Sequence, residues 1–318
     1  MRLSNEKLKE YYFGAYHYSE DTDGYLYAYQ HSYDQMEYFK KTNIFWYERS
    51  YASNAKTLEL ITDADNISFD YKIIWMGSPD TFELAEDGLI KDIRYIKKLD
   101  NEGRLSFDLS KDQKHVTVYL PTDSAVVIKN FETNTDIMPI TPEKGCRVLW
   151  LGDSITQGYG PFRSGMTYVS IANRLLNYDI INQGIGSFIY DADSLMKLDG
   201  YDPEKIIVSL GTNQFEDESV KPVSDYYDKL IGLYGTDIPI LCITPIWRGD
   251  LPSQFEKFTD YCHRIAEVAS SYSNVKIING LKLVPHLEEY YLDNLHPNCL
   301  GAQTYGFNLA KTIIDNSL

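Results

Sequence analysis

The sequence predicts an α/β protein in two parts: an antiparallel β sandwich, followed by a parallel sheet with helices on both faces. The first half contains short runs of alternating apolar and polar residues between polar turns, which is typical of antiparallel sheets. The second half alternates five apolar runs with segments of helical periodicity, the pattern of a parallel sheet. Residues 138–147, with two prolines and a glycine, look like the boundary. We therefore expect domains at 1–140 and 146–318.

Four β-rich runs define the first domain. They are 57–61, 67–75, 115–121 and 124–132. Turn-like polar residues separate the first pair at 63–66 and the second pair at Thr122-Asp123. Short strands at this spacing predict a sandwich of jelly-roll type. Residues 1–50 fit neither a helical nor a strand period.

Strands and helices alternate in the second domain. The expected strands are 148–151, 180–183, 205–210, 238–244 and 275–278, and the expected helices are 166–176, 223–234, 255–272 and one near the C-terminus. Helical spacing places Tyr168, Ile171, Ala172 and Leu175 on one face of the first helix. Pro297 suits the first turn of the last helix, where its missing N–H costs nothing.

Composition excludes several kinds of partner. The net charge is -16 and is spread over both halves, which argues against nucleic acids and anionic membrane surfaces. No run approaches 18 apolar residues, so no membrane span is expected. The N-terminus has no apolar core of signal-peptide type, so we expect a cytoplasmic protein, unless a leader has been removed. The cysteines and histidines lack metal-ligand spacing, so no metal is expected.

Polar residues follow the predicted strands of the second domain. They are Gly152-Asp153-Ser154, Asn182-Gln183-Gly184, Gly211-Thr212-Asn213, Pro245-Ile246-Trp247-Arg248 and, before the last helix, Asp293-Asn294-Leu295-His296. Because the carboxyl ends of parallel strands meet at one edge of a sheet, these side chains should lie together.

Each of these residue types has a task in acyl transfer. A serine such as Ser154 becomes a nucleophile when a base takes its proton, and His296 can be that base near neutral pH. Asp293 can hold the second ring nitrogen and select the tautomer. The N–H groups of Ser154 and Gly184 and the side-chain amide of Asn213 can donate to the oxyanion of the tetrahedral intermediate.

The blocks GDSIT, NQGIGS, GTN and DNLHP, in this order, resemble the SGNH (GDSL-type) hydrolase family. They cover residues 147 to about 315. The resemblance implies a flavodoxin-like three-layer α/β/α fold, ester hydrolysis without a cofactor, and the roles just given for the five residues. The third block often continues GTND in the family, whereas Gln214 stands here. A β-rich domain ahead of such a hydrolase also resembles two-domain carbohydrate esterases, which remove acetyl groups from sugars.

The sequence therefore predicts a serine esterase that removes short O-acyl groups, with an acetylated sugar or oligosaccharide as the favoured substrate. A lipase, lysophospholipase or thioesterase, an acyltransferase, and a non-catalytic sugar-binding protein remain alternatives, and a homo-oligomer is possible. Asp153 either lines the substrate pocket or holds its own turn. Trp247 and Arg248 either line that pocket or cover the edge of the sheet.

Overall fold

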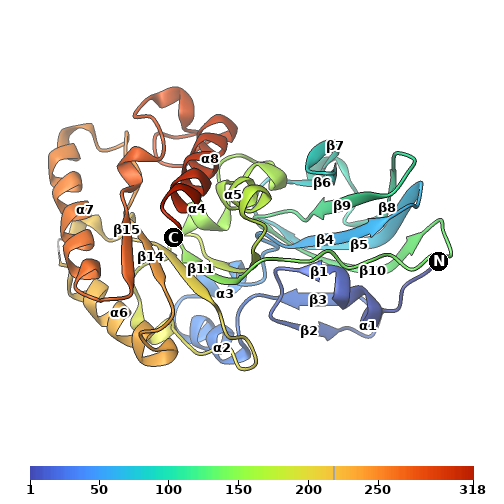
Figure 1. The fold of residues 1–318 in the computed structure, drawn as a ribbon, viewed down its shortest axis with the longest axis horizontal. Coiled ribbons are helices and arrows are strands. Elements are labelled where there is room, and N and C mark those ends of the chain that lie inside the picture. The colour runs from blue at the N-terminus through green and yellow to red at the C-terminus, as the bar shows by residue number, and fades with distance from the viewer. Residues whose placement is uncertain (218) are drawn as a thin grey trace.

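The computed structural model describes residues 1–217 and 219–318 as three five-stranded sheets (Figure 1). Two antiparallel sheets form the N-terminal half, on the right of Figure 1, and the parallel sheet with its helices forms the other half. The N-terminus lies at the far end of the sandwich, and the C-terminus lies beside the parallel sheet. The predicted fold class is confirmed in both halves.

The two antiparallel sheets pack against each other around one apolar core. One sheet has the order β1(Tyr12–Phe13), β4(Thr57–Thr62), β9(Lys114–Tyr119), β6(Thr81–Glu86), β7(Leu89–Tyr95). The other has the order β2(His17–Glu20), β3(Leu26–Tyr29), β10(Ser124–Thr133), β5(Asn66–Met76), β8(Glu102–Asp108). Phe69 of β5 and Phe82 of β6 meet in this core at a centroid distance of 6.0 Å. The jelly-roll topology stays a prediction.

Consecutive strands of the sandwich do not pair as hairpins at the two polar turns. β4 and β5, on either side of residues 63–65, belong to different sheets, and so do β9 and β10. Alternation shows only that a strand buries one face. Because both sheets bury a face in the same core, the pattern cannot tell which sheet a strand joins.

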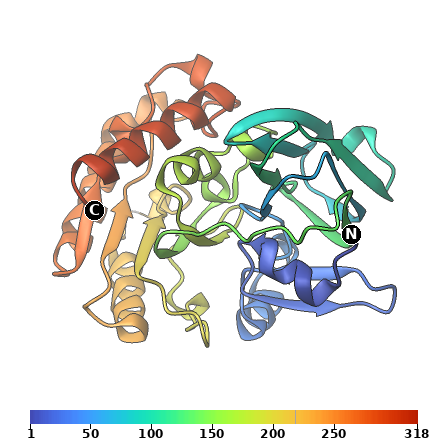
Figure 2. The ribbon, with the colours of Figure 1, turned by 45° about the vertical axis from the view of Figure 1, so that its right-hand side comes forward.

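The parallel sheet has the order β12(Asp179–Gly184), β11(Arg147–Gly152), β13(Lys205–Ser209), β14(Ile240–Ile243), β15(Val275–Ile278). This 2-1-3-4-5 order is flavodoxin-like. Side chains from α5(Tyr168–Leu176) and α8(Cys299–Asp315) fill the core on one face of the sheet, and those from α6(Lys221–Tyr234) and α7(Phe255–Ser270) fill it on the other. Figure 2 shows α8 running across the outside of this half.

Two details of the predicted helices are wrong. Leu175 is 51% exposed, because α5 buries Val169 in addition to Tyr168, Ile171 and Ala172 and ends at Leu176. Pro297 lies before α8 and not in its first turn. Asn298 is the N-cap, and its side chain accepts hydrogen bonds from the N–H groups of Leu300 and Gly301, as asparagine commonly does at that position.

Residues 1–50, which the sequence leaves unassigned, connect the two halves. They contain α1(Asn5–Leu8), α2(Tyr33–Thr42) and α3(Ile44–Arg49) as well as the first three strands. Phe39 of α2 and Trp46 of α3 pack on Phe188 beyond the end of β12, with ring centroids 5.9 Å and 4.8 Å away. The N-terminal segment is therefore part of the core that supports the carboxyl edge of the parallel sheet.

Candidate active site

Ser154 is the first residue of a short helix that starts where β11 ends. The helix α4(Ser154–Gln157) begins after Asp153, whose side chain accepts the Ile155 N–H at 3.0 Å as its N-cap. Gly158 ends it in the left-handed region at φ 111°. As the first helical residue, Ser154 has a backbone N–H without an intrahelical acceptor. Its hydroxyl and its N–H are thus both presented at the carboxyl edge of the sheet.

His296 contacts the Ser154 hydroxyl directly. The Ser154 Oγ lies 2.9 Å from His296 Nε2, although the two residues are 142 positions apart. Tyr159 packs on the ring, to which it stands edge-on with centroids 4.7 Å apart. The imidazole can therefore accept the serine proton without a rearrangement.

Asp293 orients His296 within their common loop. Asp293 Oδ2 lies 2.8 Å from His296 Nδ1, and Oδ1 accepts the backbone N–H groups of His296 and Leu295 at 2.7 Å and 3.1 Å. Partial burial acts to raise the pKa of Asp293, but these hydrogen bonds outweigh it and hold the pKa below its ordinary value. The carboxylate is thus kept ionised next to the imidazole, and Nδ1 of a neutral ring carries the proton.

The N–H of Gly184 is not free to bind an oxyanion, so that expectation is wrong. It donates to Asn182 Oδ1 at 2.9 Å, and the residue is buried. A Cβ at Gly184 would come within 2.4 Å of the Gln157 nitrogen. This glycine is required because β12 passes close to α4, and not because a substrate approaches it.

Ser187 supplies the free backbone N–H of this turn. The N–H groups of Ile185, Gly186 and Phe188 donate to Gly152 O, Gln157 Oε1 and Ile185 O respectively. The N–H of Ser187 has no acceptor within the described part of the chain, and the residue is exposed. Its φ of 58° lies in the left-handed region. Sequence reasoning missed Ser187 because a serine gives no sign of a positive φ.

Asn213 lies beside this turn. Its Nδ2 donates to Phe188 O at 2.9 Å, which leaves the second amide hydrogen for another acceptor, and the residue is exposed. Arg248 holds the Asn213 loop by donating from Nη1 to Thr212 O at 2.8 Å, and it forms two hydrogen bonds to Asp250. Arg248 therefore stabilises the loop that carries Asn213.

The remaining pocket candidates make supporting contacts. Asp153 is 2% exposed and caps α4, which is the turn-holding role that the sequence left open. Its burial raises its pKa to about 6. Trp247 is half-buried, stacks on His286 with centroids 5.7 Å apart, and packs on Tyr291 at 5.0 Å. Tyr291 pairs with Pro297, so Trp247 supports the segment that carries His296.

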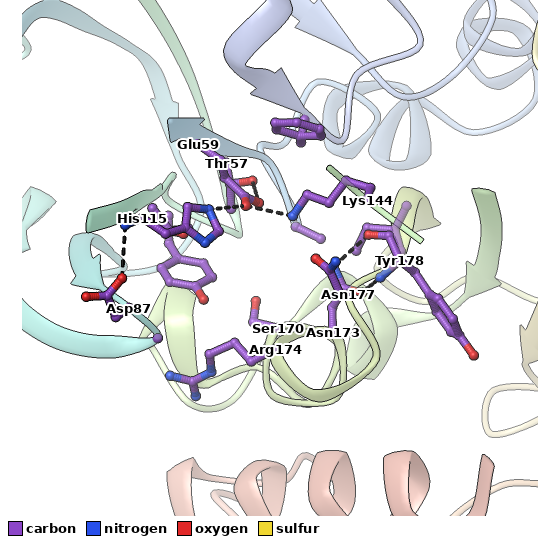
Figure 3. Close-up of a pocket in the computed structure, with 16 residues that line it drawn as sticks. Thr57, Glu59, Asp87, His115, Lys144, Ser170, Asn173, Arg174, Asn177 and Tyr178 are labelled. Atoms are coloured by element: carbon purple, nitrogen blue, oxygen red, sulfur yellow. Dashed lines mark hydrogen bonds and ion pairs between the residues drawn. The ribbon is translucent and has the colours of Figure 1, made fainter. Parts of the chain in front are cut away.

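A cavity of about 270 Å³ lies elsewhere, between the sandwich and α5 (Figure 3). Its buried carboxylate, Glu59, lies 2.6 Å from Lys144 Nζ and 3.1 Å from His115 Nε2. The cavity reaches Ile180 at the beginning of β12, whereas Ser154 follows the end of the neighbouring strand β11. The Ser154–His296 pair is therefore at the opposite edge of the parallel sheet from this cavity.

Three further findings concern residues 1–217 and 219–318. They contain no group of three or more His, Cys, Asp or Glu side chains that could hold a metal ion. Every helix among them is too short or too polar to cross a lipid bilayer. The four cysteines are unpaired thiols.

A family model matches most of the second half of the chain. The model of the GDSL-like Lipase/Acylhydrolase family matches residues 150–304, which include Ser154 and His296. No curated relative matches the sequence.

Solved structures share the fold at low sequence identity. The salicylyl-acyltransferase SsfX3 from a tetracycline biosynthetic pathway has a TM-score of 0.74 and 17% identity, over 96% of this chain and 94% of that one. A family two carbohydrate esterase from Clostridium thermocellum, in complex with cellohexaose, has 0.64 and 15%, over 84% and 94%. An acetyl xylan esterase from the rumen bacterium Butyrivibrio proteoclasticus has 0.61 and 15%, over 82% and 89%.

Proposed function

Because the chain carries a domain of the GDSL-like lipase/acylhydrolase family, we propose that it is a serine esterase that removes short acyl groups, acetyl above all, from carbohydrates. The observation that carries the proposal is the continuous chain from Ser154 Oγ to His296 Nε2 at 2.9 Å and from His296 Nδ1 to Asp293 Oδ2 at 2.8 Å. This arrangement lets His296 take the proton of the Ser154 hydroxyl as that hydroxyl attacks an ester.

In the first step, Ser154 Oγ attacks the ester carbonyl while His296 Nε2 takes the hydroxyl proton. The carbonyl oxygen becomes an oxyanion, and we assign its donors as the Ser154 N–H, the Ser187 N–H and Asn213 Nδ2. The imidazolium then gives its proton to the departing alcohol, which leaves an acyl-Ser154 ester. Asp293 stabilises the imidazolium and keeps the ring oriented.

In the second step, water attacks the acyl-Ser154 ester while His296 acts again as the base. The acid leaves and the serine proton returns. Ser187 and Asn213 are both exposed, so an ester group on a sugar or at a chain end can reach these donors. This openness supports a substrate with a small acyl group on a large alcohol. The similarity in fold to carbohydrate esterases supports the same substrate class.

The test is kcat/KM on p-nitrophenyl esters from acetate to laurate, with Ser154→Ala as the matched variant. We expect a maximum at acetate and loss of nearly all turnover in Ser154→Ala and in His296→Ala. A fluorophosphonate should label Ser154 in the wild type, because only an activated serine reacts. A maximum at long chains would move the substrate to lipids. A wild type without labelling or turnover would refute the esterase and leave a binding role.

A second candidate is acyl transfer to a hydroxyl other than water. The same acyl-Ser154 intermediate can acylate an alcohol if that alcohol binds better than water does. The similarity in fold to a salicylyl-acyltransferase, over 96% of this chain, is the reason to test acyl transfer beside hydrolysis. Adding cellobiose to the acetate assay decides it: transfer gives acetylated cellobiose in place of acetate, whereas hydrolysis leaves the acetate yield unchanged.

A further inference from the structure

The turn that carries Ser187 is connected to the β sandwich by a buried chain of hydrogen bonds. The Gly186 N–H donates to Gln157 Oε1 at 2.6 Å, and Gln157 Nε2 donates to Asp123 Oδ1 at 2.5 Å. Asp123 lies between β9 and β10 of the sandwich and is 4% exposed. One amide side chain thus joins a carboxylate of the first domain to the residue directly before Ser187.

We propose that Asp123 is a positioning residue for the acyl-transfer reaction, which acts through Gln157 to hold the Gly186–Ser187 turn with the Ser187 N–H directed at the oxyanion. This inference rests on the proposed function, since it concerns the same site. It assigns the sandwich a part in positioning the oxyanion donor.

Asp123 is well fixed by its own surroundings. Its Oδ2 accepts the Ser78 hydroxyl at 2.5 Å, and its backbone N–H donates to Asp80 Oδ2 at 2.6 Å. Arg49 Nη1 lies 3.5 Å from Oδ1. A carboxylate with both oxygens and its backbone engaged cannot turn freely, so Gln157 Nε2 has one favourable position. The Gln157 Oε1 that receives the Gly186 N–H is placed as a result.

Packing holds the same turn from the side. A Cβ at Gly186 would lie 3.1 Å from Phe45 Cε1, so the Phe45 ring is against this residue. The Arg49 guanidinium lies over the Phe45 ring at 4.8 Å and over the Trp75 ring at 4.7 Å. Each contact comes from the first 75 residues of the chain, and together they block a sideways shift of Gly186.

The start of the turn is held in a similar way. Asn54, which is fully buried, donates from Nδ2 to Asn182 O at 3.0 Å and to Gly184 O at 3.3 Å. Ser187 is the first residue after these anchors whose N–H is free, and Asn213 bonds to Phe188 just beyond it. The proposed oxyanion donor, the Ser187 N–H, therefore follows residues that the N-terminal half holds through Asn54 and Gln157, and precedes Phe188, whose carbonyl Asn213 holds.

This arrangement predicts a fall in kcat when the link breaks. Oxyanion donors act through geometry set before the reaction, and a displacement of about 1 Å can cost roughly 100-fold in rate. In Gln157→Glu the acceptor for the Gly186 N–H remains, but two carboxylates face each other where Nε2 and Oδ1 were 2.5 Å apart. We expect kcat for p-nitrophenyl acetate to fall at least tenfold while KM changes by less than threefold.

The double variant Asp123→Asn/Gln157→Glu tests the link itself. The amide introduced at position 123 can donate to the carboxylate introduced at position 157 and still accept from Ser78, so the chain to Gly186 is rebuilt with its polarity reversed. We expect kcat to return to within about threefold of the wild type, and the rate of fluorophosphonate labelling of Ser154 to recover with it. Glu59→Gln is the matched control, because it also alters a buried, ion-paired carboxylate of the sandwich, but at the opposite edge of the sheet.

The outcomes separate cleanly. If the wild type turns over p-nitrophenyl acetate and Gln157→Glu keeps kcat within twofold of it, the positioning role is overturned and the esterase proposal stands. A folded double variant, with a melting temperature near that of the wild type but without recovery of kcat, would overturn it too. So would an equal loss of kcat in Glu59→Gln, because the effect would then be one of general stability. A wild type with no Ser154-dependent turnover would refute the proposed function instead.

Discussion

Tyr159 stands edge-on to His296, with the two ring centroids 4.7 Å apart. Its backbone N–H donates to Ser154 O at 3.0 Å, so the tyrosine is tied to the end of the nucleophile helix and packs on the base. One residue thereby links the two partners of the Ser154–His296 pair from outside the hydrogen-bonded chain.

Tyr159→Ala should lower kcat roughly tenfold, because the imidazole loses the contact that restricts its rotation, and edge-to-face ring pairs contribute about 1 kcal/mol. Tyr159→Phe keeps the ring and should retain wild-type kcat. Steady-state rates on p-nitrophenyl acetate check both variants. If Tyr159→Phe lost as much activity as Tyr159→Ala, the hydroxyl would matter and the packing argument would be wrong.

Asp293→Asn should lower kcat by roughly 100-fold with little change in KM, because the imidazolium loses its counter-charge and the ring its preferred tautomer. The loss should be smaller than for a fully buried aspartate, since the Asp293 side chain is 44% exposed and water screens its charge. Asp315→Asn, which removes another exposed aspartate far along α8, is the control and should leave the rate unchanged. An Asp293→Asn enzyme within twofold of the wild type would mean that a Ser154–His296 pair is sufficient.

Ser187→Gly should keep kcat within about twofold and raise the melting temperature, because the donor is a backbone N–H and glycine adopts a φ of 58° without the cost of about 1 kcal/mol that other residues bear. Ser187→Val, with a branched Cβ, should displace the turn and lower kcat. Thermal unfolding and steady-state kinetics of the two variants form the test. A tenfold loss in Ser187→Gly would show that the serine hydroxyl itself takes part.

The placement of the candidate site residues was predictable because parallel topology collects strand ends at one edge. Ser154 follows a strand, and Asp293 and His296 share a short loop before the last helix. The alternating pattern of the second half locates both the strand and the helix. Asn213 follows for the same reason. The helix spans near these residues were predicted to within a few positions, since apolar periodicity is strong there.

The oxyanion donor was not predictable in the same way. Gly184 looks like a backbone donor in the sequence, but which N–H of a turn is free depends on where the other acceptors lie. Those acceptors come from Asn182 and from Gln157, whose own position is set by Asp123 in the other domain. Long-range polar contacts of this kind leave no periodic trace, and residues 1–50 remained unassigned because they pack on both halves.

The final prediction concerns Lys56, which is 1% exposed and whose Nζ donates to Ala52 O at 2.8 Å. Burial lowers its pKa from 10.5 to about 7. Between pH 10.5 and about pH 7 the amine is protonated in the unfolded chain but neutral in the folded one. The contribution of Lys56 to the free energy of unfolding therefore decreases as the pH falls through this range, and stays level below it. Urea unfolding at pH 7, 8 and 9.5 should therefore show the wild type gaining roughly 3 kcal/mol relative to Lys56→Met between the first and last values.

Comparing the two proteins cancels the effect of the buried thiols, which titrate in the same range. Lys221→Met, at a 76% exposed side chain, should run parallel to the wild type. A constant difference between wild type and Lys56→Met would mean that the buried amine keeps its proton throughout, held by contacts stronger than the one to Ala52.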